Sequence, residues 1–289
     1  MNKTLQNRKR LGANAKSDSA AALSLARSFG FETPKNFHQE MNWYRRAAEL
    51  GNVEAQTLLR ECYRDGHGAR RNLKLGIKLL ALAAQRGDSD AQVSIGYQYF
   101  YGEGIKRNRS KALHWYRKAA TKGQVNALAN LGLSYQFGNG VKRDYRESLK
   151  WFRKAAAQNS VRSTFWVGHS YWWARGVRKN LRRAFEWFWK AAWLGDAEAN
   201  TYVGMCFHDG VGVKKNFKRA FKHYRIASKE DPYAQHCIGL CYRDGEGVKK
   251  SRRLALLWLK KAATNGEPDA IKALRRFSKS NASAKTSHC

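Results

Sequence analysis

The stretch that decides the fold is ALANLGLSYQFGNGV, residues 127–141, followed by WFRKAA, residues 151–156. Ala127, Leu131 and Tyr135 are spaced by four residues, which places them on one face of a helix that ends near Phe137. Gly138 follows, and a glycine adopts the left-handed conformation of a helix end at little cost. Asp144 is a plausible N-cap for a second helix. The stretch therefore predicts two helices joined by a tight turn.

Tryptophans repeat this pattern along the chain. Trp43, Trp115, Trp151 and Trp187 lie at intervals of 72, 36 and 36 residues. The skipped position holds Leu79, and the count continues to His223 and then Trp258, with one residue lost. A fixed period of this length is typical of a solenoid built from stacked units.

Glycines and alanines follow the same register. The helix-ending glycine recurs with Ala174 as the one substitute. A second glycine follows two residues later except in the first repeat, and alanine pairs recur late in six of the second helices. The predicted repeats are residues 19–54, 55–90, 91–126, 127–162, 163–198, 199–233 and 234–269. Residues 1–18 are predicted to be a flexible basic arm, 270–277 a closing helix and 278–289 a disordered tail.

These repeats resemble the Sel1-like repeat, a relative of the tetratricopeptide repeat. The resemblance implies an all-α, right-handed superhelical solenoid of seven helix-turn-helix repeats. It also implies an adaptor without enzymatic activity that binds partner proteins in a concave groove. Repeat 55–90 departs from the pattern, because Arg60 replaces the glycine inside its first helix. Repeat 199–233 departs at His223 in place of tryptophan.

Composition restricts the compartment and the partner. Lys and Arg number 55 against 22 Asp and Glu, which gives a formal net charge of +33. Self-repulsion of this size favours an anionic partner. The five cysteines show no disulfide framework, which indicates a reducing, cytoplasmic location. No apolar run approaches the roughly 18 residues that span a bilayer, so no membrane insertion is expected.

The predicted groove uses the face of each first helix opposite to its buried stripe. This face is apolar and aromatic in the middle of the chain and polar towards its ends. The predicted partner-binding residues are Tyr97, Phe100, Leu133, Phe165, His169, Trp172, Trp173, Met205 and His208.

Repeat 163–198 is an outlier because it holds six of the ten tryptophans. Tryptophan is frequent at binding hot spots. Groove binding is expected for Phe165 and Trp172, whereas packing between repeats is expected for the remaining non-consensus tryptophans, Trp166, Trp189 and Trp193.

A pair of basic residues precedes the second helix in six consecutive repeats. We call these residues the basic edge: Arg70, Arg71, Lys106, Arg107, Lys142, Arg143, Arg178, Lys179, Lys214, Lys215, Lys249 and Lys250. A linear array of charge suits either an acidic protein or a nucleic acid, which would release counterions on binding. The opposing interpretation is a solvated face, because lysine is common here in the family. A second basic column, which includes Lys118 and Lys154, lies late in the second helices.

Signals of catalysis are weak. The Gly-x-Gly turns recur as structural elements and do not cradle a phosphate. Cys206, His208, His236, Cys237 and Cys241 are near one another in sequence, but Cys206 and Cys241 fall at a core position. The sequence therefore predicts no enzyme, no cofactor and no metal site.

Overall fold

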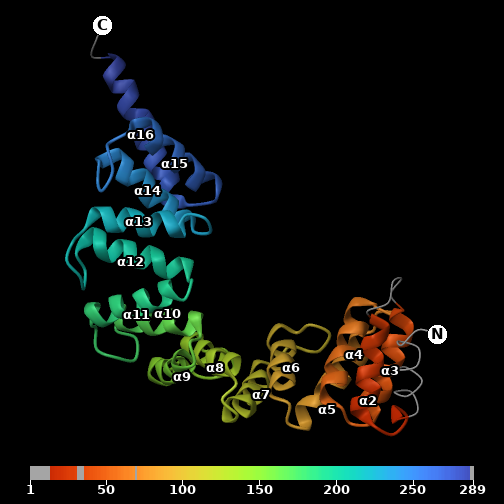
Figure 1. Cartoon of the computed structure of the whole chain (residues 1–289). Coiled ribbons are helices and arrows are strands. Elements are labelled where there is room, and N and C mark those ends of the chain that lie inside the picture. Colours follow the sequence, from red (N-terminus) through yellow and green to blue (C-terminus); the bar gives the residue numbers. More distant parts are fainter. Residues whose placement is uncertain (1–13, 31–35, 69, 287–289) are drawn as a thin grey trace. The chain divides into compact units, whose positions relative to one another are not determined.

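The computed structural model describes residues 14–30, 36–68 and 70–286, and every regular element in these residues is a helix. Figure 1 shows the helices in chain order, labelled α2 to α16. Even-numbered helices up to α14 are the first helices of the repeats, and odd-numbered helices are the second ones. The predicted all-helical repeat fold is confirmed.

The structure describes fifteen helices, of which α2 to α15 have 11 to 13 residues and α16 has 19. Their bounds are α2 Ser19–Gly30, α3 Phe37–Glu49, α4 Val53–Asp65, α5 Leu73–Gln85, α6 Ser89–Tyr101, α7 Arg109–Thr121, α8 Val125–Phe137, α9 Tyr145–Ala157, α10 Val161–Trp172, α11 Leu181–Trp193, α12 Ala197–Asp209, α13 Phe217–Ala227, α14 Pro232–Asp244, α15 Arg252–Thr264 and α16 Pro268–Thr286.

The chain forms two compact units, Met1–Arg143 and Asp144–Cys289. In the first unit, each helix from α2 to α8 packs against the next one in the chain. In the second unit the same holds from α9 to α16. Packing mainly against sequence neighbours, with a small additional contact between α14 and α16, is the arrangement of a repeat protein, in which no helix pair buries its apolar face alone.

A polar side chain starts each second helix. Asn36, Asn72, Asn108, Asp144, Asn180, Asn216 and Ser251 all accept a hydrogen bond from a backbone N–H of the first turn. These bonds satisfy donors that the helix itself leaves unpaired. The predicted cap at Asp144 is confirmed.

Left-handed residues end the first helices. Five of these helices end at a glycine with φ between 73° and 83°, for example Gly138 after α8. The exception is the turn after α10, where Ala174 adopts φ 56°. The second turn glycine has a different role. At Gly140 a Cβ would lie 2.5 Å from the Arg109 carbonyl oxygen, so only glycine allows the turn to reach α7.

Two predicted boundaries need correction. Residues 14–18 are part of the packed structure, because Ala15 is fully buried and the Lys16 carbonyl accepts a hydrogen bond from Arg46. The closing helix α16 begins at Pro268 and continues to Thr286, beyond the predicted end at residue 277. Residues 278–286 contain neither glycine nor proline, so nothing in this segment stops a helix. Predictions for 1–13 and 287–289 fall outside the described residues.

Candidate functional site: an acidic, aromatic cavity and a basic edge

The predicted groove residues of the first unit lie on α6 and α8. Tyr97 is 39% exposed and its ring stacks on Tyr101, with a centroid distance of 6.3 Å. Phe100 is half-buried and lies under the guanidinium of Arg109, 5.3 Å from the ring centroid. Leu133 is also half-buried. Tyr97 and Phe100 therefore form an aromatic surface, whereas Leu133 contributes a smaller exposed area.

The predicted groove residues of α10 and Trp173, which follows it, differ in their exposure. Phe165 is only 4% exposed, Trp172 is half-buried and Trp173 is 56% exposed. Phe165 contacts the rings of Phe188 and Tyr202, with centroid distances of 5.6 and 5.5 Å. Phe165 is thus the base of an aromatic cluster, and Trp173 is its most accessible neighbour among these predicted residues.

Two predicted histidines sit in opposite electrostatic surroundings. Burial and the charge of Arg175 lower the pKa of His169 to about 4, so this ring is neutral. Burial opposes protonation of His208 as well, but hydrogen bonds with Asp209 at 2.6 Å and Glu246 at 2.7 Å outweigh it and raise its pKa. Because Glu246 follows α14, His208 joins two neighbouring repeats and is occupied by these carboxylates.

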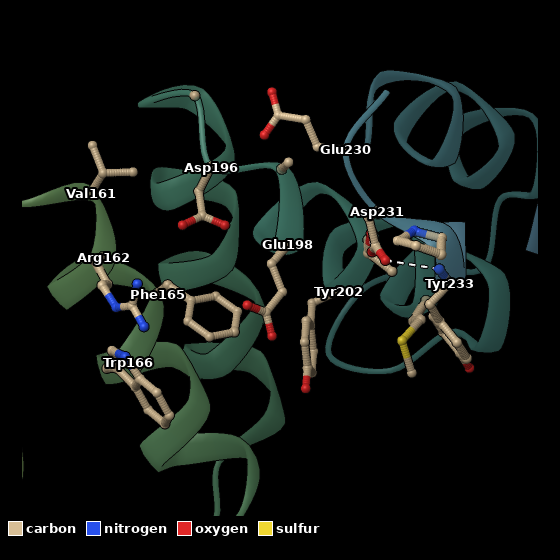
Figure 2. Close-up of a pocket in the computed structure, with 15 residues that line it drawn as sticks. Val161, Arg162, Phe165, Trp166, Asp196, Glu198, Tyr202, Glu230, Asp231 and Tyr233 are labelled. Atoms are coloured by element: carbon tan, nitrogen blue, oxygen red, sulfur yellow. Dashed lines mark hydrogen bonds between the residues drawn. The ribbon is translucent and has the colours of Figure 1, made fainter. Parts of the chain in front are cut away.

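A cavity of about 790 Å³ opens between α10, α12 and α14 of the second unit (Figure 2). The predicted residues Phe165 and Met205 line it, whereas His169, Trp172, Trp173 and His208 do not. Its aromatic lining comes from Phe165, Trp166, Tyr202 and Tyr233.

Acidic side chains dominate the polar lining of this cavity. Asp196, Glu198, Glu230 and Asp231 line it together with one cation, Arg162. Their formal charges therefore sum to about −3 in a chain whose net charge is +33. Four of the chain's 22 acidic residues meet at this one place. The sequence reasoning missed this cavity.

Helix capping explains how two of these carboxylates arrive there. Asp196 accepts a hydrogen bond from the Ala199 N–H at 2.7 Å and caps α12. Asp231 caps α14, accepts from the Tyr233 N–H at 2.8 Å and also accepts from the Thr201 hydroxyl. Each of these two aspartates caps its own helix, so each looks structural in the sequence. Their meeting depends on stacking, which brings together residues 35 positions apart.

The cavity disfavours the negative charge that it carries. Burial is the main cause that raises the pKa of Asp196, and a hydrogen bond from Ala199 only partly offsets it. Burial and the neighbouring charges of Asp196 and Asp231 raise the pKa of Glu198. Because like charges and burial both disfavour ionisation, a cation in this cavity would be stabilised.

All twelve residues of the basic edge are exposed. The eleven residues of the basic edge other than Arg143 form no ion pair with an acidic side chain in the part of the chain that the structure describes. The second residue of a pair also has a structural contact. A Cβ added at Gly210, for instance, would lie 3.3 Å from the Lys215 Cβ. Packing over the C-terminus of a first helix places this positive charge at the negative end of the helix dipole.

The second basic column is explained by contacts within a repeat and with the next repeat. Lys118, Lys154 and Lys261 lie over the rings of Trp115, Trp151 and Trp258, at 4.6 to 5.0 Å from the centroids. Such cation–π contacts contribute about 0.5–1 kcal/mol at exposed sites. Arg117 and Arg153 donate hydrogen bonds to the hydroxyls of Tyr135 and Tyr171, at 3.0 and 2.7 Å. This column therefore stabilises the repeats.

One of the tryptophans expected to pack between repeats is exposed. Trp193 is 82% exposed, so the prediction that it packs between repeats is wrong. Trp189 is 43% exposed, but its ring contacts Phe207 and His223 of the next repeat, with centroid distances of 6.0 and 5.2 Å, so it packs between repeats as predicted. Trp166 is half-buried and its ring stacks on Phe152 with a centroid distance of 5.8 Å, so it packs as expected.

The cysteines behave as small core residues. Cys206 and Cys241 are buried, and burial raises the pKa of each thiol to about 12. Among the described residues, no group of three His, Cys, Asp or Glu side chains could hold a metal ion. None of the helices described is both long and apolar enough to cross a bilayer.

Paired helices that pack in chain order, with the same caps and turn glycines in successive units, define a helical repeat protein of the solenoid class. The Sel1 repeat family matches residues 17–52, 53–88, 89–124, 125–160, 161–196, 197–231 and 232–267, and the chain belongs to this family. Proteins of this family generally act as protein-interaction scaffolds and are typically non-catalytic.

Solved structures agree with this assignment. A protective antigen of uropathogenic Escherichia coli, which displays an SLR fold, is 29% identical with a TM-score of 0.84; the match covers 91% of this chain and 57% of the antigen. The chain thus spans little more than half of that protein. A Sel1 repeat protein from Oxalobacter formigenes is 27% identical with a TM-score of 0.79, over 93% of this chain and 79% of the other. No curated protein matches the chain.

Proposed function

We propose that this protein is a non-enzymatic scaffold that holds a segment of a partner protein in the cavity between α10, α12 and α14. The supporting observation is that aromatic rings and four carboxylates line the same opening. Aromatic faces attract cations, and carboxylates accept charge-assisted hydrogen bonds from Lys and Arg side chains. The cavity therefore suits a partner segment that inserts a basic side chain beside an apolar one.

The net charge of the whole chain supports an additional, anionic contact. The sequence predicts an anionic partner, and the acidic cavity is a poor place for it. The basic edge carries the opposite charge and is fully exposed. In this proposal the cavity holds a basic segment, and an acidic part of the same partner or another one lies along the edge.

Photo-crosslinking tests the assignment of the cavity. A photoreactive phenylalanine analogue at Met205, which lines the cavity, should crosslink to a partner segment that contains Lys or Arg. Capture should fall in the double variant Glu198→Gln/Glu230→Gln, because it removes two of the carboxylates that line the cavity. This variant should still fold, since neither residue caps a helix. Glu186→Gln is the matched control, because Glu186 lies on α11 outside the cavity lining. Crosslinks to acidic segments only, or equal losses in both variants, would reject the proposal.

Nucleic acid is the second candidate partner, and the exposed row of positive charges along the basic edge supports it. Affinity should then fall steeply as salt is added, because neutralised phosphates release counterions. The variant Lys106→Ala/Lys142→Ala should reduce the slope of this salt dependence by about two contacts. Recovery of the partners should also be lost after nuclease treatment of the lysate. Recovery that is unchanged by nuclease would leave the protein partner as the better assignment.

A further inference from the structure

The first helices from α6 to α14 carry a glycine that lets the second helix of the repeat approach closely. A Cβ at Gly168 would lie 2.8 Å from the Phe188 ring, and a Cβ at Gly204 would lie 2.5 Å from the Tyr224 ring. Real Cβ atoms do not come so close to other atoms, so these positions exclude larger residues. In α4 the equivalent position holds Arg60.

Two neighbouring positions have changed in a way that makes room for Arg60. Gly76 on α5 occupies the column that holds Ala or Ser in the later repeats, and a Cβ there would lie 3.3 Å from the Arg60 carbonyl oxygen. Leu80 occupies the column of the large rings Tyr116 and Phe188, and the last repeat also has a leucine there, Leu259. The combination of Arg60, Gly76 and Leu80 therefore places an arginine side chain where the later repeats have a glycine against a ring or a leucine.

These departures coincide with a cavity of about 420 Å³ between α4, α5 and α6. Arg60, Arg64, Arg71 and the Gln98 amide form most of its polar lining, and Glu103 contributes the one carboxylate. Leu73 and Ile77 give it an apolar side. The cavity is small and presents mostly hydrogen-bond donors.

Several of these donors have no acceptor. The Arg60 side chain is 13% exposed and its Nη2 lies 3.3 Å from Glu61, but its Nε is buried without a partner within the residues described. Arg64 donates two bonds of 2.7 Å to Asp65, which occupies it. Arg71 forms no ion pair in the described part of the chain. Leaving a buried donor unpaired is unfavourable, and an acceptor in the cavity would relieve that cost.

We propose that this cavity binds one oxyanion group, a phosphate or a carboxylate, on the guanidinium groups of Arg60 and Arg71. A guanidinium presents paired donors that match the oxygens of either group. Glu103 opposes a second negative charge, so the cavity selects one oxyanion attached to an apolar or neutral remainder that contacts Leu73 and Ile77. This site lies in the first unit and does not depend on the function proposed for the acidic cavity.

Side-chain NMR of the full-length, arginine-labelled protein tests the site. The Arg60 Nε–H resonance, assigned by its loss in Arg60→Lys, should shift and saturate as sodium phosphate is added. Sodium acetate distinguishes the two oxyanions, since a shift with phosphate alone identifies a phosphate site and a shift with both identifies a general oxyanion site. Sodium chloride at equal ionic strength should leave the resonance in place. A resonance that no oxyanion moves, or that chloride moves equally, would overturn the proposal.

Matched variants separate the site from general charge. Arg71→Ala should weaken binding of phosphate or acetate about tenfold or more, through loss of charge-assisted hydrogen bonds. Arg107→Ala, the counterpart one repeat later, should leave the affinity unchanged. The double variant Arg60→Gly/Gly76→Ala restores the residue types of the later repeats, so it should keep the helical circular dichroism and lose binding. Equal losses in the Arg71 and Arg107 variants, or retained affinity in the folded double variant, would also reject the site.

Discussion

The two units each contain a cavity, and the two cavities have opposite linings. The cavity of the first unit presents guanidinium groups from Arg60, Arg64 and Arg71, whereas that of the second presents four carboxylates and aromatic rings. The repeat itself is the same in both units. One cavity comes from a changed core position inside a first helix, and the other from cap residues between helices. A repeat scaffold can therefore acquire different ligand chemistry without altering the contacts that define its fold.

The two origins differ in what they demand from the surrounding core. A basic side chain in the glycine column requires compensation at Gly76 and Leu80, because the space there is otherwise filled. An acidic N-cap requires no compensating change in the core, since Asp196 and Asp231 each bond to the first turn of their own helix. The acidic lining is thus easily acquired, whereas the basic one needs several coordinated changes.

The largest expected effect comes from placing an arginine at the glycine position of a first helix in a repeat that lacks the changes found at Gly76 and Leu80. Gly96→Arg should destabilise the protein by about 3 kcal/mol or more, because the Tyr116 ring already fills this space and a charge would be buried. Urea unfolding measures the change. Adding Ala112→Gly and Tyr116→Leu, which reproduces the arrangement around Arg60, should recover part of the loss. No recovery in the triple variant would show that Arg60 is accommodated for another reason.

Charge reversal in the acidic cavity should have the next largest effect. Glu198→Lys/Glu230→Lys should weaken binding of a Lys- or Arg-containing partner segment about a hundredfold, since two attractive contacts become repulsive. Calorimetry with the crosslinked segment as a synthetic peptide measures it. The Arg60 resonance should respond to phosphate as before, and Arg60→Gly/Gly76→Ala should still bind the peptide. If the charge reversal altered the phosphate response, or if Arg60→Gly/Gly76→Ala weakened peptide binding, the two cavities would not act separately.

A smaller effect is expected at the turn after α10. Ala174 has φ 56°, where a Cβ costs roughly 1 kcal/mol, whereas the other first helices of later repeats end at glycine. Ala174→Gly should therefore increase the free energy of unfolding by about 1 kcal/mol. The reverse change, Gly138→Ala, serves as a control and should decrease it by a similar amount. If Ala174→Gly destabilises the protein, the turn is not strained.

The residues that recur at the same position of each repeat predicted the fold, because each of them meets a local requirement of a helix end. Glycine after a first helix and a polar residue before a second one act within a few residues, so Gly138 and Asp144 could be assigned correctly. The exposure of the basic edge was also predictable, since these pairs immediately precede the caps. The exposure of Trp193 was not, because it depends on how much of α11 the next repeat covers. The acidic cavity also escaped prediction, since Asp196 and Asp231 meet only after the repeats stack.

The smallest expected effect concerns pH and the acidic cavity alone. The pKa of Glu198 is raised by burial and by neighbouring carboxylates, so the folded state disfavours its charged form. Stability is then lost as the pH rises through the raised pKa, and it returns below the ordinary pKa of a glutamate, about 4.3. Glu198→Gln should therefore stabilise the protein at neutral pH. The gain should be less than about 1 kcal/mol, because part of the Glu198 side chain is open to solvent, which screens its charge although the cavity wall desolvates the rest.

Urea unfolding at neutral and acidic pH decides the origin of that gain. The advantage of Glu198→Gln should vanish at acidic pH, where the wild-type carboxyl is neutral too. Glu186→Gln should give no gain at either pH, since Glu186 lies outside the cavity and pairs with Arg182 at 3.5 Å. A gain that persists in acid would assign the effect to packing. With a basic peptide bound at neutral pH, Glu198→Gln should lower the stability instead of raising it, because the cation of the peptide stabilises the Glu198 carboxylate.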